Sequence, residues 1–192
     1  MSSEKQEHYF KTDIEWREWL HLNHDNDNGI YLIFFKVENK ERSMRWEEAV
    51  KVALCYGWID STVKSLGNGK RRQYFCKRNV KSVWSALNKR YIEELIANNL
   101  MQSSGLLIIE KGKENGSWTA LDAAEKGIIP PKLQVAFNKN KNALENYNSF
   151  APSYRKSYLF WLNQAKRETT KDKRIAEIIK LCDANIKTRN TW

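Results

Sequence analysis

The dipeptide Asn68-Gly69 is the feature that most constrains how this chain can fold. It separates two runs that are rich in β-branched and aromatic residues, 58–66 and 71–78. A type I′ turn needs positive φ at both central residues, and Asn followed by Gly adopts this conformation at low steric cost. The sequence therefore predicts an antiparallel hairpin whose tip projects into solvent. The register that follows pairs Gly67 with Lys70, Val63 with Tyr74, Thr62 with Phe75 and Asp60 with Lys77.

Helical patterns lie on both sides of the hairpin. Thr12 and Glu15 fit a capping box, so we expect a first helix that ends in the turn-forming cluster 24–29. The run 30–37 is apolar on both alternating faces, which predicts a strand in the middle of a small sheet, covered on both sides. Ser43 is the expected cap of the next helix and Ser82 the expected cap of the one after the hairpin.

The remainder of the chain predicts helices alone. Expected starts are Ser104, the Pro130-Pro131 break and Pro152, and Thr169 or Thr170 is the expected cap of the last helix. The predicted fold class is α+β: a small antiparallel sheet with a central hairpin packed on helices, followed by a helical C-terminal subdomain. We place the domain boundary at the proline break, giving a core over 1–128 and a helical module over 129–192 that packs on it.

Positive charge is concentrated in one stretch. No Asp or Glu occurs from Ser61 to Ile92, which holds nine basic residues, whereas the whole chain has a formal net charge of +10. Aromatic rings are interleaved with these cations, and this combination suits single-stranded nucleic acid, with cations for phosphates and rings for base stacking. The same composition suits a phosphorylated small molecule, anionic lipid headgroups or an acidic protein patch. The alternative without a function is that the rings belong to the core and the cations form an ordinary solvated face.

Eight residues at the hairpin and the following helix start are the candidate ligand-binding residues. They are Trp58, Asp60, Arg71, Arg72, Tyr74, Arg78, Ser85 and Asn88. Asp60 is the one acid at the edge of this region, and neighbouring cations oppose the raised pKa that a general base needs. We interpret it as an ion-pair partner of Lys77 or Arg78.

Other chemistries have weak support. Three cysteines lie far apart without a C-x-x-C motif, which indicates buried free thiols, and the histidines at 8, 21 and 24 read as surface residues. We predict no metal site, no cofactor and no catalytic residue, and leave open whether the chain is an enzyme. The polar N-terminus and the short apolar run 30–35 predict no membrane span and a cytoplasmic location.

Several segments resemble the bacterial YdeI/OmpD-associated family. The resemblance rests on 53–61 (ALCYGWIDS), 82–90 (SVWSALNKR), 131–133, 151–162 (APSYRKSYLFWL) and 165–175, and covers nearly the full chain. The family pattern has Arg at the position of Thr170, which implies a changed local contact. The resemblance implies a role in bacteriocin protection or stress resistance, and no catalytic residue.

Three hypotheses follow. The first is a cytoplasmic binding protein of this type that resists stress, bacteriocins or antimicrobial peptides and holds an anionic partner on the basic hairpin. The second is an enzyme that acts on a small anionic substrate in a pocket near Trp58, Asp60 and Asn88. The third is a protein-interaction module that docks its partner through the helical C-terminal third.

Overall fold

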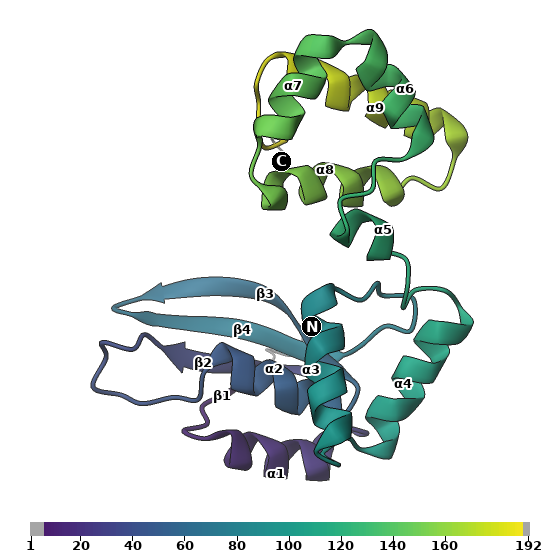
Figure 1. Ribbon diagram of the computed structural model, residues 1–192. Coiled ribbons are helices and arrows are strands. Elements are labelled where there is room, and N and C mark those ends of the chain that lie inside the picture. Colours follow the sequence, from purple (N-terminus) through teal and green to yellow (C-terminus); the bar gives the residue numbers. More distant parts are fainter. Residues whose placement is uncertain (1–5, 190–192) are drawn as a thin grey trace, which may run out of the picture. The chain divides into compact units, whose positions relative to one another are not determined.

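The computed structural model describes residues 6–189 and divides the chain into two compact units (Figure 1). Unit 1 comprises residues 1–83 and 87–118, and unit 2 comprises 84–86 and 119–192. The boundary predicted from the sequence, after residue 128, lies within unit 2 and stays a prediction as a domain boundary. No helix in the described range is both long and apolar enough to cross a bilayer.

Unit 1 is built on a four-stranded sheet in the order β1-β2-β4-β3. The strands are β1 (Glu7–His8), β2 (Gly29–Phe35), β3 (Trp58–Gly67) and β4 (Lys70–Lys77). The α+β class is confirmed and β2 is an inner strand as predicted. The sheet is mixed rather than purely antiparallel, because the short β1 joins β2 in parallel. Covering of β2 is also less complete than predicted, since Tyr31 and Phe35 are only half-buried.

One face of the sheet carries the core of unit 1. The helices of this unit are α1 (Asp13–Asn23), α2 (Trp46–Cys55), α3 (Ala86–Ala97, in unit 1 from Leu87) and α4 (Ser103–Glu114). Trp16 on α1 is fully buried and meets the rings of Trp58 and Phe75 edge-on at centroid distances of 6.3 and 5.8 Å. Burial of such large rings supplies much of the hydrophobic free energy of this unit.

The hairpin forms as predicted, but its register shifts along its length. Asn68 and Gly69 have φ of 47° and 71°, and Gly67 pairs with Lys70. Two irregularities in β3, between Asp60 and Val63 and between Ser65 and Gly67, each add a residue to that strand. The predicted partners of Asp60, Thr62 and Val63 are therefore wrong. Asp60 lies opposite Phe75 and Val63 opposite Gln73. Counted from the turn toward the start of β3, each bulge displaces all pairs beyond it by one residue.

Three predicted helix caps are also wrong. Ser43 accepts a hydrogen bond from the backbone N of Phe35 at 2.9 Å, and α2 begins after Arg45 instead. The helix expected after Ser82 starts at Ala86. The last helix is preceded by Arg167 rather than Thr169 or Thr170. The Thr12 cap of α1 is confirmed, since its hydroxyl accepts from the Glu15 backbone N at 3.3 Å.

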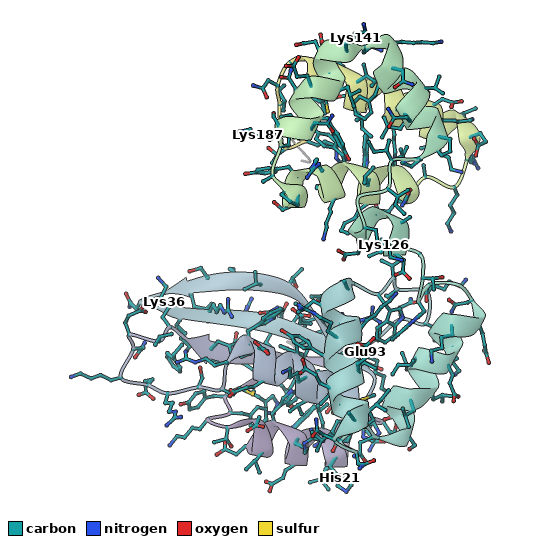
Figure 2. All side chains as sticks on the ribbon, in the orientation of Figure 1. His21, Lys36, Glu93, Lys126, Lys141 and Lys187 are labelled. Atoms are coloured by element: carbon teal, nitrogen blue, oxygen red, sulfur yellow. The ribbon has the colours of Figure 1, made fainter. Side chains whose placement is uncertain are left out.

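Unit 2 is a small helical bundle. Its helices are α5 (Asp122–Glu125), α6 (Pro131–Lys139), α7 (Lys141–Ser149), α8 (Pro152–Asn163) and α9 (Glu168–Asp183). Side chains from all five helices fill its interior (Figure 2), and the fully enclosed ones include Leu133, Phe137 and Leu159. Cys55 and Cys182 are buried free thiols as predicted, whereas the third cysteine, Cys76, is only half-buried. Burial raises the pKa of Cys182 to about 12.

Candidate functional site

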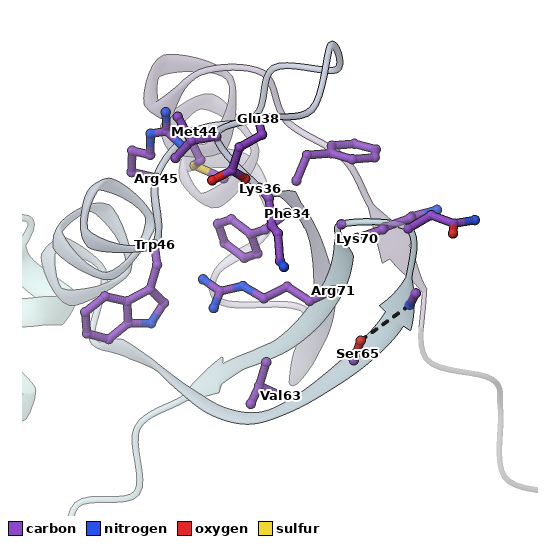
Figure 3. A pocket seen from close by; sticks show the side chains of 15 residues that line it. Phe34, Lys36, Glu38, Met44, Arg45, Trp46, Val63, Ser65, Lys70 and Arg71 are labelled. Carbon is purple, nitrogen blue, oxygen red and sulfur yellow. Dashed lines mark hydrogen bonds between the residues drawn. The ribbon is translucent and has the colours of Figure 1, made fainter.

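A groove of about 800 Å³ lies at the turn end of the sheet in unit 1 (Figure 3). Four segments line it: the end of β2, the loop 36–45, the first residue of α2, and the distal half of the hairpin. The lining cations come from two of these segments, the loop 36–45 and the hairpin. They are Lys36, Arg45, Lys70 and Arg71.

The groove lies on the same face of the sheet as the core of unit 1, beyond the part of that face that is buried. Leu32, Gln73 and Phe75 point to the core, and Phe34 and Arg71 follow them in the same register on β2 and β4. Paired residues in antiparallel strands share a face, so Phe34 forms the apolar floor and Arg71 rises from it. The Arg71 guanidinium lies 5.4 Å from the centre of the Phe34 ring, within cation–π range.

The bulges in β3 bring Val63 and Ser65 to the wall of this groove. With regular pairing, Lys64 and Leu66 would share the face of Asp60. The extra residue after Asp60 places Val63 and Ser65 on that face instead, opposite Gln73 and Arg71. Both line the groove in Figure 3.

Hydrogen bonds fix the loop 36–45 against the hairpin turn. The backbone N of Lys36 donates to the Gly69 carbonyl at 2.8 Å, and the Asn39 amide donates to the Asn68 carbonyl at 3.5 Å. The bond from Phe35 N to the Ser43 hydroxyl closes the base of the loop. Cations that are far apart in the sequence thereby meet at one edge.

Trp46, the first residue of α2, forms one wall of the groove, and a hydrogen bond to Asp60 fixes its side chain. Its indole Nε1 donates to Asp60 Oδ2 at 2.9 Å, and Gln73 Nε2 donates to the same oxygen at 2.5 Å. Gln73 is 6 % exposed, whereas Trp46 is half-buried and keeps part of its ring open to the groove. Figure 3 shows Arg71 extending toward this ring.

The groove cations differ from two cations of the acid-free stretch whose charged groups have partners within the protein. Arg72 pairs with Glu7 at 2.5 Å and lies over the Tyr31 ring at 4.5 Å. Lys77 donates to the Asp25 carbonyl at 2.7 Å. In contrast, none of the four groove cations forms an ion pair with a carboxylate of residues 6–189.

Several predicted site residues lie away from the groove. Trp58 is 1 % exposed and its Nε1 donates to the His24 carbonyl at 3.2 Å, so it is a core residue. Tyr74 packs on Tyr31 at 5.0 Å on the opposite face of the sheet, which also carries Arg72. Only Arg71 of the eight lines the groove, and Asp60 supports it through Trp46.

Arg78 is buried and serves the structure of unit 1. It is 5 % exposed, and its Nη2 donates to the Val83 carbonyl at 2.6 Å. Burial lowers the pKa of Arg78 to about 10, while the negative charge of Asp60 acts in the opposite direction. The predicted interaction with Asp60 is thus long-range, and the hydrogen bonds of Asp60 go to Trp46 and Gln73. Ser85 and Asn88 are half-buried and do not line the groove.

Sequence reasoning missed Lys36, Arg45 and Trp46. They precede the acid-free stretch, and only the pairing of β2 with β4 brings them to the hairpin turn. A usable signal was the cluster of cations at the end of the predicted strand 30–37 and directly after it, namely Lys36, Lys40, Arg42 and Arg45. In residues 6–189 we find no group of three His, Cys, Asp or Glu side chains that could hold a metal ion.

Comparison with known families gives two matches. Residues 8–108, more than half of the chain, match the family model described as "Domain of unknown function (DUF8412)". Residues 126–185 match the model described as "Bacteriocin-protection, YdeI or OmpD-Associated". The suspected resemblance is therefore confirmed over the C-terminal segment, while the N-terminal segment matches a separate family. No curated protein and no solved structure matches the chain.

Proposed function

Because this chain belongs to the DUF8412 family over residues 8–108 and carries a YdeI/OmpD-associated segment over 126–185, we propose that it is a cytoplasmic binding protein of the bacteriocin-protection type that holds an anionic partner in the groove of unit 1. The groove supplies the binding surface for this partner. The family match supports the resistance role.

The observation that carries the proposal is the charge imbalance of the groove. Four cations line it, and Glu38 is the single acid among its lining residues. Cations that line one groove without carboxylate partners repel one another, and a bound anion relieves that repulsion. Arg72 of the same hairpin has a structural role, and in contrast to the groove cations it is paired with Glu7.

The shape of the groove favours an extended partner that carries several phosphates. Its cations are spread over the loop 36–45 and the strand β4 rather than converging on one point. The open part of the Trp46 ring can stack on a planar group, and Ser65 offers a hydroxyl. A single-stranded nucleic acid meets both conditions, since it combines regularly spaced phosphates with planar bases.

The test is binding of a labelled random single-stranded oligonucleotide, followed by fluorescence anisotropy at low salt. Replacement of both Lys70 and Arg71 by Glu should weaken binding by about a hundredfold, since each reversal removes an attraction and adds a repulsion. The matched control is Lys81→Glu, which changes an exposed cation of the same acid-free stretch outside the groove. It should bind within a few-fold of the wild type.

Two outcomes would overturn the proposal. One is the absence of oligonucleotide binding by the wild type at low salt. The other is an equal loss in the groove variant and the Lys81→Glu control, because the binding would then follow total charge rather than the groove. Thermal denaturation of each variant verifies that the fold is intact.

The resistance role is tested separately in cells. A strain that lacks the protein should become more sensitive to bacteriocins or cationic antimicrobial peptides. Wild-type protein should restore resistance and the Lys70→Glu, Arg71→Glu variant should not. Equal rescue by both would separate resistance from the groove, and cell fractionation tests the cytoplasmic location.

No specific observation favours the alternative that the protein is an enzyme with a pocket near Trp58 and Asp60. Trp58 fills the core, and the Oδ2 of Asp60 already accepts two hydrogen bonds. The interaction-module alternative stays a hypothesis, which deletion of the residues after Pro130 would test through loss of the resistance phenotype.

A further inference from the structure

A second concave site lies in unit 2, along one face of α8. Its lining residues from α8 and the residue after it recur at helical spacing, and they include Ser153, Ser157, Trp161 and Gln164. Arg189, from the segment after α9, closes a cavity of about 270 Å³. The hydroxyls of Ser153 and Ser157 form no hydrogen bond with another described residue, and neither does the side-chain amide of Gln164.

Two arginines converge on the indole of Trp161. The Arg189 guanidinium carbon lies 3.9 Å from the ring centre and that of Arg174 lies 4.9 Å from it. Arg174 Nη1 also donates to the Trp161 backbone carbonyl, which fixes that side chain. Arg189 Nε is buried and has no hydrogen-bond partner. A buried donor without an acceptor is costly, so it indicates a place where an acceptor is expected.

The charge of this arginine pair is not balanced by the acids of unit 2. Glu168 and Asp172 on α9 are engaged by Lys132, and Lys171 also binds Glu168. Within residues 6–189, however, neither Arg174 nor Arg189 forms an ion pair. Burial and the charge of Arg174 together lower the pKa of Arg189.

We propose that Arg189 and the hydroxyl face of α8 form a binding site for a phosphate group, either free or at the end of a small phosphate monoester. The guanidinium fork of Arg189 matches the oxygen geometry of a phosphate, and the nearby charge of Arg174 adds to the positive potential there. Ser153, Ser157 and Gln164 supply further neutral donors. The small volume selects a compact headgroup, which distinguishes this site from the open groove of unit 1.

The site is tested by isothermal titration of the full chain at constant ionic strength. Inorganic phosphate and phenyl phosphate are the two probes, and chloride is the reference anion. Tighter binding of phenyl phosphate would identify a monoester as the ligand, and tighter binding of inorganic phosphate would identify the free ion. Arg189→Gln should lower the affinity for the preferred probe by about tenfold or more, since it removes charge-assisted hydrogen bonds.

Arg167→Gln is the matched control. It removes the same charge from an exposed arginine of unit 2 outside the cavity, and it should leave the affinity within about twofold of the wild type. Phosphate binding no stronger than chloride, or an unchanged affinity in Arg189→Gln, would overturn the proposal. Because the cavity and the groove lie in different units, Arg189→Gln should leave oligonucleotide binding unaltered, so the two proposals fail independently.

Discussion

Replacement of Asp60 by Ala should destabilise unit 1 strongly for a residue that is only half-buried. Asp60 Oδ2 accepts hydrogen bonds from Trp46 and Gln73, and both lose their acceptor in the variant. A hydrogen bond to a charged group contributes about 1.5–3 kcal/mol. Gln73 is buried and bears the full loss, whereas water can replace the acceptor of the half-buried Trp46. The expected net loss is therefore about 2–4 kcal/mol.

Urea denaturation followed by tryptophan fluorescence measures this loss. Asp60→Asn is the matched control, because its side-chain oxygen can still accept both hydrogen bonds without the charge, and it should lose only about 1 kcal/mol. A loss below about 0.5 kcal/mol in Asp60→Ala, the range of ordinary surface substitutions, would refute the role of this carboxylate.

Three further predictions concern single residues. Gly105→Ala should cost about 1–3 kcal/mol in urea denaturation, because a Cβ there would lie 2.3 Å from the Cys55 backbone oxygen; a wild-type midpoint would contradict this packing. Arg78→Glu should lower the thermal midpoint markedly, since it places an unpaired carboxylate at a site that is 5 % exposed, and an unchanged midpoint would show that the site is open. The pKa of Glu168 is lowered to about 2 by neighbouring lysines, so its contribution is present above the usual value of 4.5 and is lost as pH falls toward 2. Glu168→Gln should therefore reduce the fall in thermal midpoint between pH 6 and pH 3, and an identical fall in both proteins would argue against these ion pairs.

Local sequence signals predicted the elements of this fold well. Asn68-Gly69 fixed the hairpin turn because its positive φ values depend on those two residues alone. Pro131 and Pro152 marked the starts of α6 and α8 for the same local reason. The caps proposed at Ser43 and Ser82 failed because a serine can satisfy other donors or lie in a turn, as the bond of Ser43 to the Phe35 backbone shows.

The site was harder to predict because it depends on long-range pairing. The bulges of β3 are set by strand twist and packing, and they decide whether Val63 or Lys64 faces the groove. Arg71 and Arg72 are adjacent in the sequence, yet they lie on opposite faces of β4 and have different surroundings. A count of cations along the chain locates the charged region but does not distinguish its groove side from its structural side.

The salt dependence of oligonucleotide binding tests the central claim most directly. If Lys36, Arg45, Lys70 and Arg71 each neutralise one phosphate, log K should fall against log salt with a slope of about −2.8. Raising salt from about 50 to about 200 mM would then weaken binding by about 50-fold. Replacement of all four by Gln should bring the slope close to zero. A steep slope that survives in this variant would show that the anion binds elsewhere and would contradict the account.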